Sequence, residues 1–195
     1  MQAIVAEHTG GPEVMQLVTL PDPEPAPGQL RVRVEAAGVN FIDVYHRSGQ
    51  YAQPLPLRLG QEGAGVVEAV GEGVTDVAPG DRVAWASAPG SYATHVRLDA
   101  ARAVPVPSGV TSTVAAAAML QGMTAHYLAR STFPLAAGHT AVVHAAAGGV
   151  GLLLCQLARA AGARVIGVVS TDAKAEKARA AGADEVVVSS RDDFA

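Results

Sequence analysis

The sequence of 195 residues contains one cysteine, Cys155. A single cysteine excludes an intramolecular disulfide and a multi-cysteine zinc site. Charged residues make up only 16% of the chain, and its net charge of −4 comes without a basic cluster, which argues against nucleic-acid binding. The chain also lacks an uninterrupted apolar run long enough to cross a membrane and, at residues 1–4, the start of a signal peptide. With 49% apolar residues, the sequence predicts a soluble, globular, cytoplasmic protein without a nucleic-acid or membrane partner.

The first part of the chain is divided by Gly and Pro into short alternating or β-branched runs. The runs that we interpret as strands are 30–35, 65–70, 81–86 and 92–96. The proline-rich residues 21–28 form a connector rather than a regular element. Many short strands separated by turn signals predict a β-barrel or a β-sandwich.

The pattern changes after residue 112, where helices and buried strands begin to alternate. Alanine-rich segments at 114–119 and 124–129 are expected to be two helices. They are followed by an expected strand (140–144), helix (150–161), strand (164–169), helix (172–181) and strand (185–188). Gly162 and Gly182 stand where helix C-terminal caps belong. This alternation is typical of the first half of a doubly wound parallel sheet.

A glycine-rich turn, residues 146–151, lies between the strand at 140–144 and the next helix. Gly148 would let the backbone approach a pyrophosphate, and Gly151 would let the helix pack on the strand. The helix N-terminus supplies free N–H groups for phosphates. Ala146 replaces the first glycine of the usual dinucleotide fingerprint, so a ligand-free turn is an alternative; the strand–turn–helix context favours a dinucleotide site.

The end of the following strand indicates which nicotinamide cofactor is bound. NAD-binding chains place an acidic residue there to bind the ribose 2′-hydroxyl, whereas this chain has Ser170. The hydroxyls of Ser170 and Thr171 and the cation Lys174 could hold a 2′-phosphate. Asp172 comes two residues late and is expected to cap or charge the first helical turn. Lys174 alone could be an ordinary surface lysine, but the missing acid and the added cation together favour NADPH.

Three segments resemble one known family. Residues 38–51 closely resemble the signature of bacterial quinone oxidoreductases, residues 60–71 resemble the glycine-rich barrel segment of the medium-chain dehydrogenase/reductase superfamily, and residues 144–151 are similar to the phosphate loop of its quinone reductase branch. This zeta-crystallin-like, zinc-free resemblance implies a GroES-like β-barrel domain over residues 1–120. It also implies an incomplete Rossmann-type NADPH-binding domain over residues 121–195, with the cofactor in the cleft between the two.

The resemblance also implies which residues contact the cofactor. The nicotinamide side would be lined by residues 40–45 and Tyr127, the pyrophosphate would be held by the glycine loop, and the adenosine phosphate by residues 170–174. The residues carried over as cofactor-binding are Asn40, Phe41, Ile42, Asp43, Tyr45, Tyr127, Gly148, Gly149, Val150, Ser170, Thr171 and Lys174. Ser189 stands where such relatives usually carry a tyrosine near the adenine.

The same comparison implies that the site holds no metal. Zinc alcohol dehydrogenases of this superfamily place a cysteine and a histidine where this chain has Asn40 and Gln61, and neither is a usual zinc ligand. Without a Lewis acid, the site suits an electrophilic acceptor such as a quinone or an activated alkene.

We therefore expect Asn40, Asp43 and Tyr51 to act in catalysis, with Tyr45 and Arg47 as further polar candidates around the acceptor. In the alternative interpretation, Asp43 only fixes its loop and Tyr51 only forms a pocket wall.

Several functional interpretations remain open at this stage. The main one is an NADPH:quinone oxidoreductase; the others are an NADPH-dependent reductase of enals or enones and a non-catalytic NADPH-binding protein. A full dinucleotide domain has about six strands, and only three are expected here. The sequence is thus expected to be part of a longer chain that forms a homodimer, and these residues alone to bind NADPH weakly and turn over little.

Overall fold

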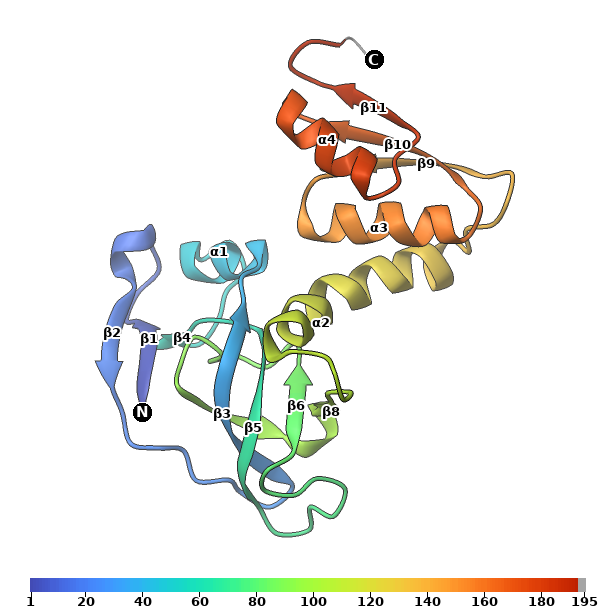
Figure 1. The fold of residues 1–195 in the computed structure, drawn as a ribbon. Helices are drawn as coiled ribbons and strands as arrows, with labels where there is room; N and C mark the ends of the chain where they lie inside the picture. The colour runs from blue at the N-terminus through green and yellow to red at the C-terminus, as the bar shows by residue number, and fades with distance from the viewer. Residues whose placement is uncertain (193–195) are drawn as a thin grey trace. The chain divides into compact units, whose positions relative to one another are not determined.

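The computed structural model describes residues 1–192. It divides into two compact units, Met1–Leu120 and the residues from Gln121 onward (Figure 1). In the described residues, no helix is long and apolar enough to cross a membrane.

The first unit is built from two antiparallel sheets. The five-stranded sheet has the order β7-β3-β5-β6-β8, and the three-stranded sheet has the order β2-β1-β4. The strands are β1 (Gln2–Ala6), β2 (Gln16–Thr19), β3 (Gln29–Gly38), β4 (Leu57–Arg58), β5 (Glu62–Val70), β6 (Arg82–Trp85), β7 (His95–Asp99) and β8 (Val104–Pro105). Short 3-10 helices occupy Pro12–Val14 (η1) and Ala100–Arg102 (η2). A bridge between Ala3 and Ala93 connects β1 to the segment that leads into β7.

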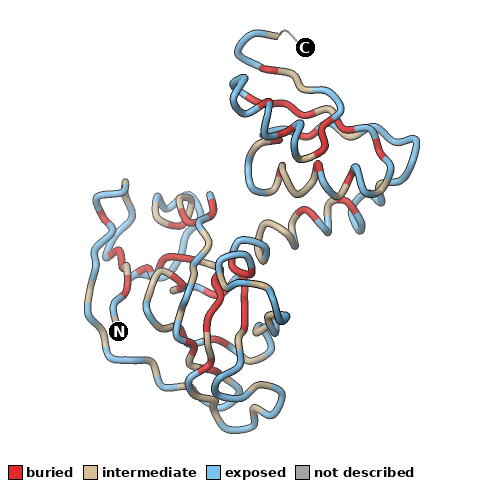
Figure 2. The backbone as a smooth tube through the Cα atoms, viewed as in Figure 1, coloured by how far each residue is buried: buried red, intermediate tan, exposed pale blue. Residues whose placement is uncertain are grey.

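The core of this unit lies on the inner face of the five-stranded sheet. Its largest members are Leu30, Val32, Val67, Trp85 and Leu98, none more than 1% exposed. Figure 2 colours the buried stretches of the backbone red. At the start of β3, buried Leu30 and Val32 alternate with partly buried Arg31, because successive side chains of a strand point to opposite faces. Burying each large aliphatic side chain contributes about 1.5–3 kcal/mol.

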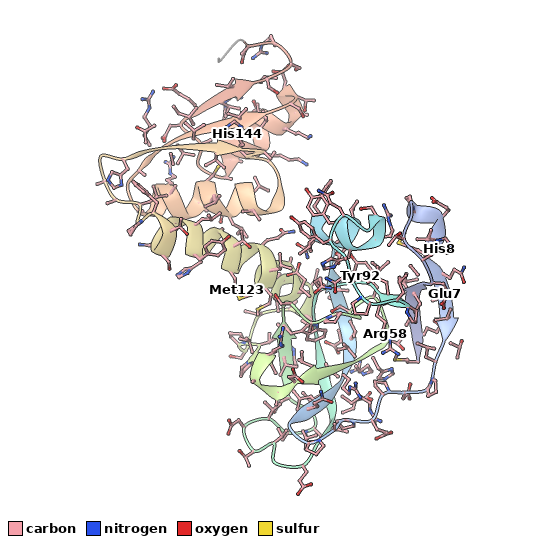
Figure 3. The ribbon with its side chains drawn as sticks, turned by 180° about the vertical axis from the view of Figure 1, so that it is seen from behind. Glu7, His8, Arg58, Tyr92, Met123 and His144 are labelled. Carbon is pink, nitrogen blue, oxygen red and sulfur yellow. The ribbon has the colours of Figure 1, made fainter. Side chains whose placement is uncertain are left out.

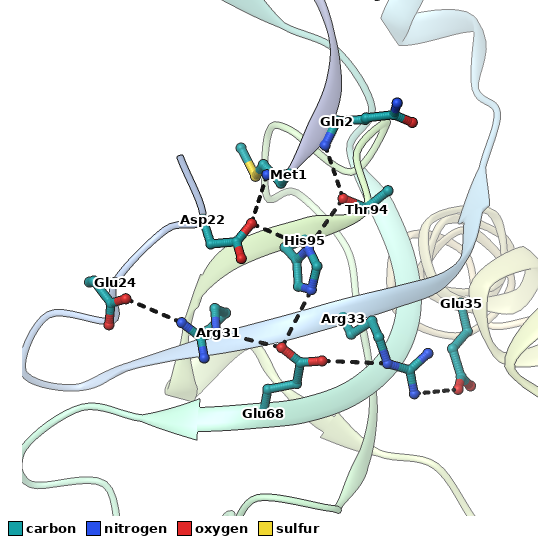
Figure 4. Close-up of polar contacts among 10 residues, drawn as sticks. All are labelled: Met1, Gln2, Asp22, Glu24, Arg31, Arg33, Glu35, Glu68, Thr94 and His95. Carbon is teal, nitrogen blue, oxygen red and sulfur yellow. Dashed lines mark hydrogen bonds and ion pairs between the residues drawn. The ribbon is translucent and has the colours of Figure 1, made fainter. Parts of the chain in front are cut away.

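An ion-pair network covers part of the outer surface of the same sheet (Figure 4). Glu68 of β5 pairs with Arg31 (3.6 Å) and Arg33 (3.5 Å) of β3 and with His95 (3.4 Å) of β7. Opposite charges thus cross-link β3 and β5, and the Glu68 carboxylate also reaches His95 of β7.

Helix α1 (Phe41–Ser48) follows β3 and was not expected from the sequence. Asn40 is its N-cap, in an extended conformation, and Asp43 accepts a hydrogen bond from the Asn40 backbone N–H (3.1 Å), which forms a capping box. Gly49 ends the helix in the left-handed region, with φ 81°.

Helix α2 (Ser112–Tyr127) corrects another expectation. The two helices expected at 114–119 and 124–129 are one continuous helix, which extends into a π-helical turn, η3 (Leu128–Thr132). Gly122 lowers helix propensity but does not end the helix, because one glycine costs a helix only about 1 kcal/mol relative to alanine. Ala115 and Ala116 pack against Ala64 and Ala84 of the five-stranded sheet.

The second unit is a parallel βαβαβ arrangement. Its elements are β9 (Thr140–His144), α3 (Gly149–Ala160), β10 (Arg164–Val169), α4 (Asp172–Ala180) and β11 (Glu185–Val188), and the sheet order is β11-β10-β9. The core joins Cys155 and Ala158 of α3, Ala175 of α4, and Val143 and Val165 of the sheet. All three strands have the expected bounds, and both helices agree with the expected ones within one residue at each end.

The outcome for the first unit is more mixed. Strands were expected at 30–35, 65–70 and 81–86, where β3, β5 and β6 lie, although β3 and β5 are longer. The strand expected at 92–96 is wrong in its bounds, since β7 begins only at His95. Tyr92 instead donates its backbone N–H to Leu59 and accepts from Ile4, so it belongs to the connection between the two sheets.

Candidate functional site

The glycine-rich turn of the second unit has a tightly folded backbone. β9 ends at His144, and Ala145 then adopts a left-handed conformation with φ 50°. Its carbonyl accepts a hydrogen bond from Gly148 N–H (2.7 Å), and Gly148 is the extended N-cap of α3. The first N–H groups of α3 therefore lie directly after this turn, in the arrangement that binds anions.

Other atoms approach two glycines of the turn closely, and at Gly151 these atoms belong to the backbone, which cannot rotate away. A Cβ at Gly151 would collide with the Ala145 carbonyl oxygen and lie 2.7 Å from the Ala146 Cα. A Cβ at Gly149 would collide with the side-chain amide of Gln121, with its Nε2 only 2.8 Å away. Gly151 thus allows α3 to pack on the turn that follows β9, and Gly149 leaves room for the Gln121 side chain.

A pocket of about 400 Å³ opens beside this turn at the carboxyl ends of β9 and β10. Its lining residues come from the turn, the two strand ends, α4 and the end of β11: His144, Ala145, Ala147, Gly148, Val168, Val169, Ser170, Lys174 and Ser189. Figure 3 marks His144 in this unit. Open α/β sheets bind their ligands at the carboxyl ends of their strands, so the pocket lies where a nucleotide is expected.

The polar residues that line this pocket include Ser170 and Lys174. Lys174 Nζ donates to Ser170 Oγ over 3.0 Å, and both side chains are exposed. Thr171, also expected at a phosphate, is the N-cap of α4, and its hydroxyl accepts from Lys174 N–H (3.4 Å). Asp172 lies in the first turn and pairs with Arg191 (2.8 Å), so it charges the helix start but does not cap it.

In the first unit, the site residues gather around the start of α1. Glu62 of β5 is fully buried, and its two carboxylate oxygens accept from Asn40 Nδ2 and from Leu120 N–H, each over 2.6 Å. Asn40 and Asp43 are 7% and 6% exposed. The expected site residues Asn40 and Asp43 are therefore held in a buried hydrogen-bonded cluster.

Tyr92 completes this cluster. Its hydroxyl donates to Asp43 Oδ2 over 2.8 Å; Figure 3 labels Tyr92 in the first unit. Burial raises the pKa of the Tyr92 phenol well above its usual range, and the hydrogen bond to the Asp43 carboxylate raises it further. Tyr92 is thus a hydrogen-bond donor at all physiological pH values, which fixes the orientation of the Asp43 carboxylate.

Two buried polar atoms near this cluster have no hydrogen-bond partner. They are Asp43 Oδ1 and Arg47 Nε, and both residues line a pocket of about 200 Å³ together with Asn40, Tyr92 and the apolar Met15, Val39, Val44 and Leu59. Buried polar groups in folded proteins are normally paired. One acceptor and one donor are therefore presented by the walls of a mostly apolar pocket.

The aromatic residues expected at the site form a separate group on α1 and the segment after it. The ring centroids of Phe41 and Tyr45 lie 5.2 Å apart, and those of Tyr45 and Tyr51 lie 5.1 Å apart. Phe41 and Tyr51 are 69% and 50% exposed, so a large apolar surface remains open to a planar ligand. Beneath them, buried His46 faces Gln61, with 3.5 Å between His46 Nδ1 and Gln61 Nε2.

The structure groups some of the expected residues and leaves others apart. Gly148, Ser170 and Lys174 line one pocket, whereas Gly149 and Val150 begin α3 without lining it. Asn40 and Asp43 line the smaller pocket, but Phe41, Ile42, Tyr45 and Tyr51 do not. Tyr127 is half exposed on α2 and lines neither pocket.

Sequence reasoning gave no role to Glu62 or Tyr92. The run 60–71 contains two glutamates, Glu62 and Glu68, and the sequence alone gives no signal that Glu62 is the buried one. Among residues 1–192, no group of three His, Cys, Asp or Glu side chains is arranged to hold a metal ion.

Two family models match the chain. Residues 26–108 match the alcohol dehydrogenase GroES-like domain, and residues 149–195 match the zinc-binding dehydrogenase family. The fold class expected from the sequence, a GroES-like β domain followed by part of a Rossmann-type sheet, is confirmed by these matches and by solved relatives.

Individual relatives cover nearly the whole chain. The sequence is 49% identical to a quinone oxidoreductase of Pseudomonas aeruginosa over 188 residues, which are 95% of this chain and 58% of that protein. It is 41% identical to a 2-haloacrylate reductase of a Burkholderia species, with all of this chain and 61% of that protein covered. The solved structure of Escherichia coli quinone oxidoreductase complexed with NADPH superposes with a TM-score of 0.97 at 42% identity, over 99% of this chain and 60% of the other. The chain thus spans about three fifths of the length of these relatives.

Proposed function

Since this chain belongs to the quinone oxidoreductase family of the medium-chain dehydrogenase/reductase superfamily, we propose that it acts in the NADPH-dependent reduction of quinones without a metal ion. The observation that carries this proposal is the pocket at the carboxyl ends of β9 and β10, whose lining residues include Ser170 and Lys174 and no acid. We further propose that residues 1–120 serve the acceptor and residues 121–195 the cofactor.

The residues present fit a bound NADPH. Gly148 lines the pocket, and the first N–H groups of α3 follow it, so they would hold the pyrophosphate. Lys174 Nζ and Ser170 Oγ, 3.0 Å apart, would share the oxygens of the ribose 2′-phosphate. Thr171, as the N-cap of α4, would fix the start of the helix that carries Lys174. Gly149 and Val150 would supply backbone contacts at the start of α3.

The first unit would contribute the surroundings of the reacting groups. Residues 40–45 and Tyr127 would contact the nicotinamide side, and the unpaired Asp43 Oδ1 and Arg47 Nε would meet polar groups of a bound ligand. When bound, NADPH supplies a hydride, which with one proton converts a quinone to a hydroquinone. The exposed rings of Phe41 and Tyr51 would stack on the flat acceptor and exclude water from it. The Tyr51 hydroxyl and the Asn40 side chain would stabilise the oxygen that gains negative charge.

A reductase of activated alkenes is the second candidate. The 41% identity to a 2-haloacrylate reductase favours it, because the double bond of a haloacrylate is conjugated to a carboxylate. The same pocket could align either acceptor, since both accept a hydride at an electrophilic carbon or oxygen without metal activation. We also propose that the protein works in the cytoplasm as a homodimer, on a small-molecule substrate.

Steady-state kinetics with paired donors and acceptors tests the proposal. NADPH oxidation is followed at its absorbance maximum, with 1,4-benzoquinone, with 2-haloacrylate and with no acceptor; NADH is the matched donor. We expect quinone to accelerate NADPH oxidation at least ~10-fold over haloacrylate and NADPH to be preferred over NADH. Faster turnover with haloacrylate would favour the second candidate, and NADPH binding with no acceleration by either acceptor would indicate a non-catalytic binding protein.

A further inference from the structure

Glu62 is the only charged side chain of the described residues that is fully buried. Its carboxylate has two N–H donors at 2.6 Å: the Asn40 carboxamide, at the start of α1, and the Leu120 backbone, within α2. The end of β3 also packs closely on it, because a Cβ at Gly38 would collide with the Glu62 side chain. Three elements, β5, α1 and α2, therefore meet at one buried carboxylate.

A carboxylate suits this position because both of its oxygens accept and neither donates. A glutamine has one acceptor oxygen and one NH₂ group, so it cannot accept from both donors. Rotation of the Asn40 carboxamide does not restore the match, because its oxygen belongs to the capping box with Asp43. The charge of Glu62 thus determines which way round the Asn40 side chain lies.

We propose that Glu62 is a positioning residue: through Asn40 it sets the first turn of α1, and through Leu120 it fixes that turn relative to the middle of α2. This inference rests on the proposed function, since Asn40 and residues 41–43 are the segment assigned to the nicotinamide side. Glu62 itself is buried and lines neither of the two pockets. Its effect on turnover passes through the orientation of Asn40.

A reciprocal exchange of the two side chains tests the proposal. In Glu62→Gln, one of the two donors loses its acceptor, and in Asn40→Asp two carboxylates face each other in a buried site. In the double variant, the carboxylate introduced at position 40 would accept from the side-chain NH₂ introduced at position 62. The amide oxygen at position 62 would accept from Leu120 N–H. Both hydrogen bonds of position 62 are then present again and the total charge is unchanged. Only the direction of the hydrogen bond between positions 40 and 62 is reversed.

The measurements are kcat and KM for NADPH and 1,4-benzoquinone, with thermal unfolding of every variant. Small misplacements at a reacting centre cost up to ~10²-fold in rate. We therefore expect each single change to lower kcat by ~10- to 100-fold and the double variant to regain at least ~10-fold of that loss. Glu68→Gln is the matched control, because it removes a partly exposed carboxylate from the same strand; its kcat should stay within ~2-fold.

The outcomes separate this inference from the proposed function. A double variant as slow as the worse single variant, although folded, would overturn the positioning role, as would an unchanged kcat in folded Glu62→Gln. If the unaltered protein does not oxidise NADPH with any acceptor, the proposed function fails instead. The role of Glu62 is then decided by the Asn40 side-chain NH₂ and Leu120 N–H resonances. Both should shift in Glu62→Gln, and the Leu120 resonance should return toward its original position in the double variant; resonances that stay in place in Glu62→Gln would refute the inference.

Discussion

Replacement of Gly151 by alanine is expected to separate α3 from the phosphate turn. The new Cβ would lie 2.7 Å from the Ala146 Cα and closer still to the Ala145 carbonyl oxygen. Because nonbonded carbon atoms prefer a separation of about 3.5–4.0 Å, the start of α3 must move by roughly 1 Å. Both opposing atoms belong to the backbone, so no side-chain rotation can absorb the collision.

Gly122→Ala provides the reference for this change. Gly122 lies within α2, and no atom is found within 4 Å of a Cβ built there. Alanine in a helix is favoured over glycine by about 1 kcal/mol, so Gly122→Ala is expected to raise the free energy of unfolding by that amount. Gly151→Ala has the same intrinsic gain but also carries an overpacking cost of about 1–3 kcal/mol. The difference between the two variants therefore isolates the steric cost at the turn.

Urea unfolding and NADPH titration of both variants measure these effects. Gly151→Ala should be less stable than Gly122→Ala by about 1–3 kcal/mol, and its NADPH affinity should fall at least ~10-fold, which corresponds to about 1.4 kcal/mol. Gly122→Ala should bind NADPH as the unaltered protein does. Equal stabilities of the two variants, with equal NADPH affinities, would refute the assignment of the turn as a tightly packed phosphate loop.

Three further predictions concern single contacts. Tyr92→Phe removes the donor to Asp43 Oδ2 and should lower the free energy of unfolding by about 1.5–3 kcal/mol in urea titrations. Because the raised pKa of Tyr92 keeps its proton in the folded state while the unfolded chain loses it above about pH 10, stability should fall with rising pH in that window, and less so in Tyr92→Phe. Lys174→Ala should weaken NADPH binding ~10-fold and leave NADH binding within ~2-fold in fluorescence titrations; equal losses would contradict a 2′-phosphate contact. The Ser112 hydroxyl, with smaller contributions from Arg33 and Arg82, lowers the pKa of the Glu35 carboxyl, so Ser112→Ala should raise that pKa in carbon-13 NMR titrations. The contribution of this contact to stability is present above the unfolded pKa and is lost as pH falls through the folded one.

The second unit could be predicted from sequence because its signals are local. A buried parallel strand such as 164–169 is continuously apolar, and a glycine follows each helix near its end, so the elements and their order follow from the nearest neighbours along the chain. The phosphate turn could be assigned for the same reason. Its carbonyl contact with Gly151 depends only on residues six positions apart.

The first unit and its polar cluster depend on distant parts of the chain. β1 pairs with β2 and β4, and Tyr92 reaches Asp43 across 49 positions, so no window of sequence contains both partners. Asn40 and Asp43 could be singled out by their family signature. Glu62, by contrast, could be assigned a role only once the structure placed it between Asn40 and Leu120.

The left-handed conformation of Ala145 has a consequence for the thermodynamics of ligand capture. Left-handed turn positions usually carry glycine, which can adopt many backbone conformations before a ligand binds. Alanine at φ 50° costs free energy to adopt this conformation, but it has fewer other backbone conformations than glycine. The ordering entropy of the loop is therefore lost during folding and not at the moment of association. A dinucleotide that binds this preorganised loop loses less affinity to entropy. Glycine adopts the left-handed conformation without strain, so Ala145→Gly should relieve backbone strain but make the entropy of NADPH binding less favourable, as measured by calorimetry.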